Sequence, residues 1–326
     1  MLDKSTFDVA RYWEERYASG RNSGSGSYNR LAKFKSHFIN NFVDKKSIYS
    51  VVELGCGDGA QLSLMDYERY LGLDISKTTI KNCAEKYKND PRKLFRHYDP
   101  NLFETSKYSS YELGVSLDVI YHLSNNDVYE RYLEHLFGLA SKYVIIYSNS
   151  QSLYHKGVDE SAKYVRFREF HKDIEKDYSE WGLVEVEPNF YPFNASLPDE
   201  TSFADFYVFK KDATNEERLT TNTNHIYEYF LKKIIHKQMV NDELNIKLIE
   251  KLDTIIDVVN SLKSSKEIEL ILEELTRLSL VKGSTVEAPH MSEKNLNVLL
   301  DNAQSGLGNS EIISLLDFGL EKRDCN

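Results

Sequence analysis

The sequence contains little that would place the chain in an oxidising compartment or a membrane. Its 326 residues include three cysteines, Cys56, Cys83 and Cys325, whose spacing fits neither a disulfide framework nor a zinc site. No run approaches the ~20 apolar residues that a membrane helix needs. The charged N-terminus lacks the apolar core of a secretory signal. We therefore predict a soluble, cytoplasmic protein without a membrane span.

The sequence also has fewer basic than acidic residues, and it lacks the common metal-binding motifs. Lys and Arg total 41 against 51 Asp and Glu, which gives a formal net charge of −10. Because nucleic acids bind proteins largely through Lys and Arg that displace counterions from phosphates, a nucleic-acid partner is not expected. The sequence has no HExxH motif, no paired CxxC motif and no carboxylate cluster, so we predict no metal site.

The sequence does contain an alternation of short apolar runs with helical patterns. The apolar runs predict strands at residues 50–54, 70–74, 94–98, 111–117, 143–147, 184–187 and 203–210. Strands interleaved with helices indicate a mostly parallel sheet that is covered on both faces. We predict an α/β fold, a Rossmann-like three-layer sandwich, whose last two strands join one edge and can pair antiparallel.

Changes in composition divide the chain into five segments. These are an N-terminal helical lid at 1–47, the α/β domain at 48–211, a polar linker at 212–225, a helical or coiled-coil region at 226–282, and a tail with short helices at 283–326.

The fourth segment, 226–282, has a helical repeat. Its apolar residues follow the 4,3,4,3 spacing of a coiled-coil seam at Leu248, Leu252, Ile255, Val259 and Leu262. Two interpretations stay open. The segment is either a helical hairpin packed on the α/β domain, or a stalk that binds a second copy of the chain or a partner protein.

A glycine-rich turn lies between the first two predicted strands. Residues 51–61 read Val-Val-Glu-Leu-Gly-Cys-Gly-Asp-Gly-Ala-Gln, so that Gly55, Gly57 and Gly59 alternate. Glycine is needed where the backbone turns sharply beneath a ligand, because a Cβ would block the ligand. Asp74 ends the next strand, where its carboxylate can accept both hydroxyls of a ribose. Strand, glycine turn, helix, strand and terminal acid together predict a site for a nucleoside-bearing cofactor.

This turn resembles motif I of the class I S-adenosylmethionine-dependent methyltransferases, which runs (E/D)xGxGxG and begins here at Glu53. Residues 71–76 resemble their second motif, and Asp99 matches the position whose acid contacts the adenine amino group. Residues 117–123 resemble the motif that lines the pocket near the reactive methyl group. The resemblance covers about residues 10–210. It implies S-adenosylmethionine as the cofactor, held by Glu53, Gly55, Cys56, Gly57, Gly59, Asp74, Ile75, Asp99 and Leu117.

More narrowly, the chain looks like methyltransferases of bacterial surface-polysaccharide and glycan pathways. The features that carry this likeness are the helical C-terminal extension, Tyr12-Trp13, the 21–27 loop, residues 28–31 and the Tyr121-His122 pair. The likeness implies O-methylation of a sugar, a glycan or another small polar acceptor.

Methyl transfer to a hydroxyl requires removal of a proton, and His122 is the candidate base. It follows the C-terminal end of a predicted strand, where open parallel sheets place their ligands. The unperturbed pKa of histidine, ~6.5, suits proton removal near neutrality. The alternative is that His122 caps a helix or binds a loop. Asp118 either orients His122 or caps the following helix, and Tyr121 is a candidate substrate contact.

Other candidate residues are cationic or aromatic. Arg30 is the candidate partner of the methionyl carboxylate, because a guanidinium can bind a carboxylate through two parallel hydrogen bonds. Alternatively, Arg30 forms a surface salt bridge. Tyr12 and Trp13 either cover the cofactor as a lid or pack the first helix onto the sheet. Arg166 and Arg168 alternate as on one face of a strand, where they either grip an anionic substrate or are exposed charges.

Two other functions stay open. The segment from Gly55 to Ala60 also fits the dinucleotide pattern GxGxx(G/A), which makes an NAD-dependent oxidoreductase an alternative. The other alternative is a non-catalytic scaffold that retains the fold and acts through its coiled coil.

Overall fold

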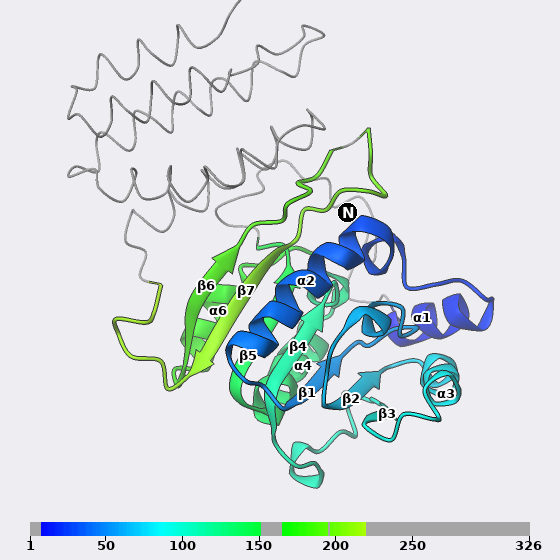
Figure 1. The fold of residues 1–326 in the computed structure, drawn as a ribbon, viewed down its shortest axis with the longest axis horizontal. Coiled ribbons are helices and arrows are strands. Elements are labelled where there is room, and N and C mark those ends of the chain that lie inside the picture. Colours follow the sequence, from blue (N-terminus) through cyan, green and yellow to red (C-terminus); the bar gives the residue numbers. More distant parts are fainter. Residues whose placement is uncertain (1–7, 151–164, 195, 220–326) are drawn as a thin grey trace, which may run out of the picture. The chain divides into compact units, whose positions relative to one another are not determined.

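One β-sheet organises the protein, whose computed structural model describes residues 8–150, 165–194 and 196–219 (Figure 1). The strands are β1 (Ser50–Leu54), β2 (Arg69–Asp74), β3 (Lys93–His97), β4 (Tyr111–Leu117), β5 (Ala140–Ser148), β6 (Trp181–Glu187) and β7 (Asp205–Lys211). They are arranged in the order β3-β2-β1-β4-β5-β7-β6. The predicted coiled-coil region, 226–282, and the tail, 283–326, lie outside the described residues.

The sheet is mostly parallel. Strands β1 to β5 are parallel neighbours, whereas β7 is antiparallel to both β5 and β6. The dinucleotide-binding form of the doubly wound sheet has the order 3-2-1-4-5-6. Here a seventh, antiparallel strand separates the fifth from the sixth. The structure confirms the predicted α/β fold, including the antiparallel pairing of the last two strands.

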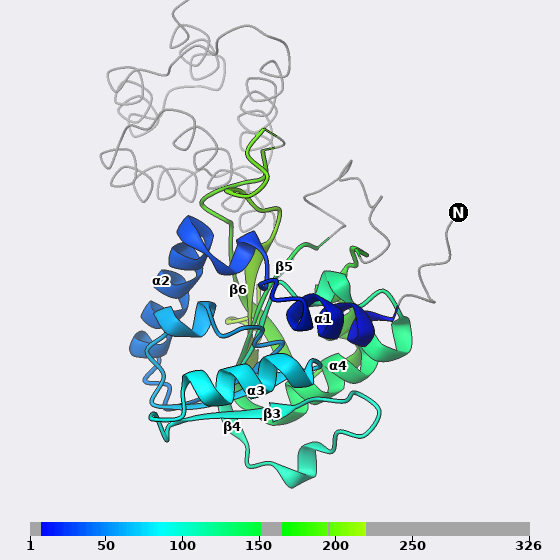
Figure 2. The ribbon, with the colours of Figure 1, turned by 90° about the vertical axis from the view of Figure 1, so that its right-hand side faces the viewer.

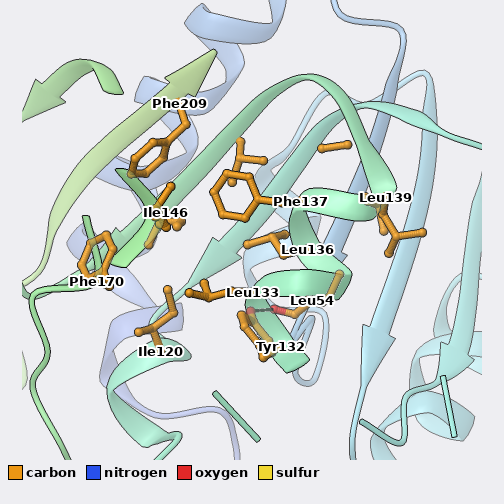
Figure 3. Close-up of a cluster of buried hydrophobic side chains, with 14 of the residues drawn as sticks. Leu54, Ile120, Tyr132, Leu133, Leu136, Phe137, Leu139, Ile146, Phe170 and Phe209 are labelled. Carbon is orange, nitrogen blue, oxygen red and sulfur yellow. Dashed lines mark hydrogen bonds between the residues drawn. The ribbon is translucent and has the colours of Figure 1, made fainter. Parts of the chain in front are cut away.

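Helices cover both faces of the sheet (Figure 2). Helix α2 (Asn29–Lys45) packs on one face, and α4 (Asn126–Leu139) and α6 (Phe170–Asp177) pack on the other. Helix α3 (Lys77–Lys86) packs beside β3, and α1 (Val9–Ala18) packs beside α3. Figure 3 shows the core beneath α4, where Leu133, Leu136 and Phe137 meet side chains from the strands.

The sequence forms these elements for simple reasons. Strands β1 and β4 lie in the middle of the sheet, and almost every one of their side chains is buried. Strands covered on both faces therefore read as continuous apolar runs. Side-chain caps fix the starts of three helices, because Asp8, Ser76 and Asn125 each accept a hydrogen bond from a backbone N–H of the first turn.

Two local predictions are wrong. The glycine turn does not open an α-helix; it leads into a single 3₁₀ turn, η3 (Gln61–Leu64), because only residues 55–68 join β1 to β2 and the chain must bury Met65 and Tyr67 on the way. The segment around Arg166 and Arg168 is not a strand, and Arg168 makes an isolated bridge with Ser150.

The start of the predicted linker, residues 212–219, packs against β6. The Arg218 guanidinium donates to the backbone carbonyls of Trp181, at 3.1 Å, and Ser179, at 2.9 Å. The Leu219 N–H donates to the Leu183 carbonyl at 2.7 Å. Among the helices that the structure describes, each is too short or too polar to cross a bilayer.

We predict that Leu136→Ala destabilises the domain by about 2–5 kcal/mol, because it leaves a cavity between α4 and β4. Leu136 is fully buried. Urea unfolding followed by circular dichroism measures the change. Leu102→Ala is the matched control, since 76% of Leu102 is exposed. Equal midpoints for the two variants would contradict the core assignment.

Candidate functional site

The glycine turn sits at the carboxyl end of β1 and is tied to β2. The N–H of Gly55 donates to the Leu73 carbonyl at 2.7 Å, and the N–H of Gly57 donates to the Asp74 carboxylate at 2.9 Å. Both glycines have positive φ, +88° and +55°. A Cβ on Gly55 would fall 2.4 Å from the Val119 side chain. Glycine is therefore required here both by the backbone conformation and by the close approach of a neighbouring loop.

Asp74 is a buried carboxylate that can accept further hydrogen bonds. Besides Gly57, it accepts a hydrogen bond from the Ser76 N–H at 2.9 Å. Burial raises the pKa of Asp74 to about 6, although these two hydrogen bonds act to lower it. An ionised carboxylate offers roughly four acceptor positions, and the backbone takes two. The two that remain match the pair of hydroxyls on a ribose.

A cavity of about 340 Å³ opens over this turn. Its walls come from α1, the 23–27 loop, the glycine turn and the segments that follow β2 and β4. The sequence-predicted residues that line it are Tyr12, Trp13, Glu53, Gly55, Cys56, Gly57, Asp74, Ile75, Leu117, Asp118, Tyr121 and His122. The structure therefore brings the predicted cofactor residues and the predicted acceptor residues to one space.

Glu53 is a second buried carboxyl in the cavity wall. It accepts a hydrogen bond from the Tyr70 hydroxyl at 2.6 Å. Burial raises its pKa to about 7, while the hydrogen bond and the nearby charge of Lys35 act to lower it. Near neutral pH this carboxyl is therefore partly protonated.

The first helix closes the cavity from the side of α3. The Glu14 carboxylate accepts hydrogen bonds from the hydroxyls of Ser76, at 2.6 Å, and Thr78, at 2.5 Å. These hydrogen bonds lower the pKa of Glu14 and favour its ionised form. A carboxylate at the first turn of α3 also complements the positive end of the helix dipole.

The loop that follows α1 is held directly on the glycine turn. The Asp58 carboxylate accepts hydrogen bonds from the Ser23 N–H, at 2.8 Å, and the Tyr28 hydroxyl, at 2.7 Å. The Ser23 hydroxyl accepts one from the Asp58 N–H at 3.0 Å. Residues 8–28, which we call the lid, are thus held by hydrogen bonds to α3 through Glu14 and to the glycine turn through Ser23 and Tyr28.

Another part of the cavity wall is formed by the turn after β4. Asp118 has a φ of +60°, and its carboxylate accepts hydrogen bonds from Lys35 Nζ, at 2.6 Å, and the Tyr121 hydroxyl, at 3.0 Å. His122 lies on the 3₁₀ turn η5 (Ile120–His122). The His122 ring meets the Trp13 ring edge-on, with 5.4 Å between centroids. The lid and the candidate base are therefore in contact.

Three predicted cofactor residues do not line this cavity. Arg30 binds Glu200, with Nε 2.6 Å from the backbone carbonyl, and its guanidinium lies 4.5 Å from the centroid of Tyr191. Gly59 faces α3, where its carbonyl accepts a hydrogen bond from the Tyr87 hydroxyl at 2.8 Å. Asp99 lines an adjoining cavity of about 310 Å³ that shares Ile75, Tyr98 and Pro100 with the first.

The two arginines predicted to grip a substrate also lie elsewhere. The guanidinium groups of Arg166 and Arg168 both donate to the Ser124 carbonyl, at 3.1 and 3.2 Å. The Arg168 guanidinium also lies 4.3 Å from the centroid of the Tyr129 ring. Both arginines line a surface groove beside α4 and α6 rather than the cavity over the glycine turn.

Sequence reasoning missed several polar residues of the cavity wall, among them Arg16, Tyr17, Ser23 and Lys35. The position of Lys35 in the sequence does indicate a buried site. It stands four residues after Leu31 and four before Ile39, on the apolar stripe of α2. A lysine in such a stripe requires a buried partner, and that partner is distant in sequence.

Comparisons with known proteins found one family model and several similar solved structures. Residues 14–137 match the family model of the mRNA (guanine-N(7))-methyltransferase domain. Among solved structures, the chain is similar to the N-methyltransferase NodS from Bradyrhizobium japonicum WM9, with a TM-score of 0.49 and 13% identity over 63% of this chain and 100% of that chain. A comparison with curated proteins found no match.

Two further solved structures are similar. One is an S-adenosylmethionine-dependent methyltransferase from Anabaena variabilis ATCC 29413, with a TM-score of 0.48 and 16% identity over 64% of this chain and 96% of that chain. The other is magnesium protoporphyrin IX methyltransferase (ChlM) from Synechocystis PCC 6803 with bound S-adenosylhomocysteine, with a TM-score of 0.45 and 14% identity over 62% and 98%.

The matched family model is one of methyltransferases, and it spans the glycine turn, Asp74 and the turn after β4. The inserted antiparallel strand distinguishes this sheet from the dinucleotide-binding form, which disfavours an oxidoreductase. The acceptor capacity left on Asp74 fits a ribose. The chain is thus an enzyme of the S-adenosylmethionine-dependent methyltransferase class, with S-adenosylmethionine as its cofactor.

Proposed function

We propose that this methyltransferase acts on an oxygen of a small polar acceptor, such as a sugar or glycan hydroxyl. One observation carries the proposal: the turn after β4, with Tyr121 and His122, lines the same cavity as the glycine turn. The lid of residues 8–28 covers that cavity, which favours a small acceptor group over a large folded one. The bound cofactor supplies an electrophilic methyl group on its sulfonium.

The residues of the cavity divide into cofactor and acceptor groups. Asp74 would accept the ribose hydroxyls, and Ile75 and Asp99 would contact the adenine from the adjoining cavity. The glycine turn would carry the methionyl part beneath the lid. Much of the catalysis is then positioning, because methyl transfer needs the acceptor held in line with the methyl carbon.

The acceptor hydroxyl must also lose its proton. His122 is the proposed base, since it lies at the carboxyl edge of the sheet and lines the cavity. Its edge-on contact with Trp13 couples its position to the lid. Tyr121 is the proposed contact for a polar group of the acceptor.

A second candidate acceptor is the N7 atom of a guanine cap on RNA. It is favoured by the family model that matches residues 14–137. It is disfavoured by the net charge of −10, because RNA binding depends on basic residues that neutralise phosphates. A ring nitrogen such as guanine N7 carries no proton, so this acceptor would not need His122 as a base.

We predict that the protein binds S-adenosylhomocysteine more tightly than ~1 mM and does not bind NADH at that concentration. Isothermal titration measures both. Labelled methyl transfer is then measured with cell extract fractions rich in glycan and with a guanosine-capped dinucleotide. Label in a glycan hydroxyl supports the proposal, whereas label confined to the cap replaces it with the second candidate. Folded protein that binds no S-adenosylhomocysteine would contradict both.

We predict that the affinity for S-adenosylhomocysteine falls as the pH decreases through about 6. Burial raises the pKa of Asp74 to about 6, and the protonated form accepts fewer hydrogen bonds. Below that pH the loss approaches about tenfold per pH unit. Titration calorimetry across the pH range measures it.

Two variants identify the group responsible for this pH dependence. Asp74→Asn should bind weakly and show no drop near pH 6. Glu53→Gln should keep the drop, because its own carboxyl has a pKa of about 7 and Asp74 is intact. A wild-type affinity that stays constant down to pH 5 would refute the ribose role of Asp74.

We predict that His122→Ala lowers kcat for a hydroxyl acceptor by about 10²–10⁴-fold, because the base is lost. The affinity for S-adenosylhomocysteine should change little. His37→Ala is the control, since His37 is exposed on α2. Steady-state kinetics against pH provide the measurement. Turnover that persists with an unchanged pH profile would remove His122 as the base.

A further inference from the structure

A fully buried lysine lines the cavity from the face of α2 that packs on the sheet. The Lys35 side chain has essentially no solvent exposure, and its ammonium lies 5.2 Å from the centroid of the Tyr147 ring. An ammonium group in such a place is costly unless it is paired and hydrogen-bonded. Its partner is the Asp118 carboxylate, 2.6 Å away and 83 positions later in the chain. This ion pair therefore joins α2 to the turn after β4.

Three segments meet at the Asp118 carboxylate. One oxygen accepts the hydrogen bond from Lys35, and the other accepts the hydrogen bond from the Tyr121 hydroxyl. The lid loop passes over the same group so closely that a Cβ on Gly26 would fall 2.8 Å from it. Asp118 itself has positive φ, a conformation that few residues other than Gly, Asn and Asp adopt readily. An acid in this strained position must be held in place by its surroundings.

Resting on the proposed function, we infer that Lys35 is a positioning residue for methyl transfer. Its buried ammonium holds the Asp118 carboxylate, and Asp118 in turn fixes the Tyr121 hydroxyl at the acceptor end of the cavity. A phenol that donates its hydrogen to Asp118 acts toward other groups as an acceptor. The arrangement therefore selects an acceptor molecule that presents a hydrogen-bond donor, such as a second hydroxyl, beside the group that is methylated.

Several charged or titratable groups surround the ion pair. Lys35 from α2 and Tyr121 from η5 donate hydrogen bonds to the Asp118 carboxylate, and the Tyr147 ring from β5 lies beside the Lys35 ammonium. Burial raises the pKa of Tyr147 well above its usual range, so that this phenol stays neutral. Lys35 also faces Glu53, whose pKa its charge acts to lower. Among these neighbours, Lys35 is the group that brings a positive charge to the Asp118 carboxylate.

The test compares Lys35→Met, Asp118→Asn and the double variant with the wild type. Lys33→Met is the matched control, because Lys33 is an exposed residue two positions earlier on α2. We expect Lys35→Met to lower kcat by about 100-fold, as a misplaced acceptor would. The affinity for S-adenosylhomocysteine and the KM for the cofactor should change less than about threefold. Asp118→Asn should resemble Lys35→Met, and the double variant should be no worse than either.

A second readout does not depend on turnover. In protein labelled with ¹³C at the aspartate carboxyl carbon, the Asp118 signal is identified by its loss in Asp118→Asn. We expect the chemical shift of this carboxyl carbon to change in Lys35→Met, because the ammonium that contacts the carboxylate is removed. If Lys35→Met alone fails to fold, the double variant, which removes both charges, is compared with Asp118→Asn.

The outcomes are distinct. A wild type that binds no S-adenosylhomocysteine overturns the proposed function and this inference with it. A wild type that binds and transfers methyl groups, with unchanged kcat in Lys35→Met, overturns the positioning role alone. Losses that multiply in the double variant also overturn it, because residues that act as one unit are not additive. An unaltered Asp118 carboxyl signal in Lys35→Met would show that Lys35 does not act on this carboxylate, and would also overturn the positioning role.

Discussion

The site depends on one buried carboxylate, that of Asp74, which accepts hydrogen bonds from the backbone of two neighbouring turns. Asp74 ends β2 and accepts hydrogen bonds from the N–H groups of Gly57, on the neighbouring turn, and Ser76, at the start of α3. The two turns are thereby held at a fixed distance across the carboxyl ends of β1 and β2. Because the carboxylate is already oriented by its protein partners, a ribose that replaces water at its remaining positions meets an organised acceptor. The glycine turn also needs residues without a Cβ, because a Cβ on Gly55 would clash with Val119.

The lid is also held in place by carboxylates that accept hydrogen bonds. Asp58, within the glycine turn, receives hydrogen bonds from Ser23 and Tyr28, just as Glu14 receives them from Ser76 and Thr78. Both carboxylates have lowered pKa values for that reason. The lid is therefore attached in part through partly exposed hydrogen bonds. Such contacts open at lower cost than a packed core does, which a cavity that must exchange its cofactor requires.

Features that depend on a single local segment of the chain were predictable from the sequence. The middle strands of a parallel sheet are buried on both faces, so β1 and β4 appear as apolar runs with the bounds that the structure gives them. The glycine turn and Asp74 were predictable because their chemistry is local. The pairing of Lys35 with Asp118 was not, because it joins positions 83 residues apart and depends on how α2 crosses the sheet. Arg30 shows the opposite error, since its residue type suited a carboxylate but its helix directs it to Glu200.

Two buried carboxyls in the cavity wall would favour a positively charged ligand such as a sulfonium. Burial holds the pKa of Asp74 at about 6 and that of Glu53 at about 7, so both carboxyls are costly to ionise in the free protein. A cation brought among them repays that cost, because an opposite charge favours the ionised form. Lys35 acts on Glu53 in this way, although its ammonium also contacts Asp118. The aromatic rings of Tyr12 and Trp13 add faces that attract a positive charge. A positively charged ligand in the cavity would therefore favour the ionised forms of Asp74 and Glu53.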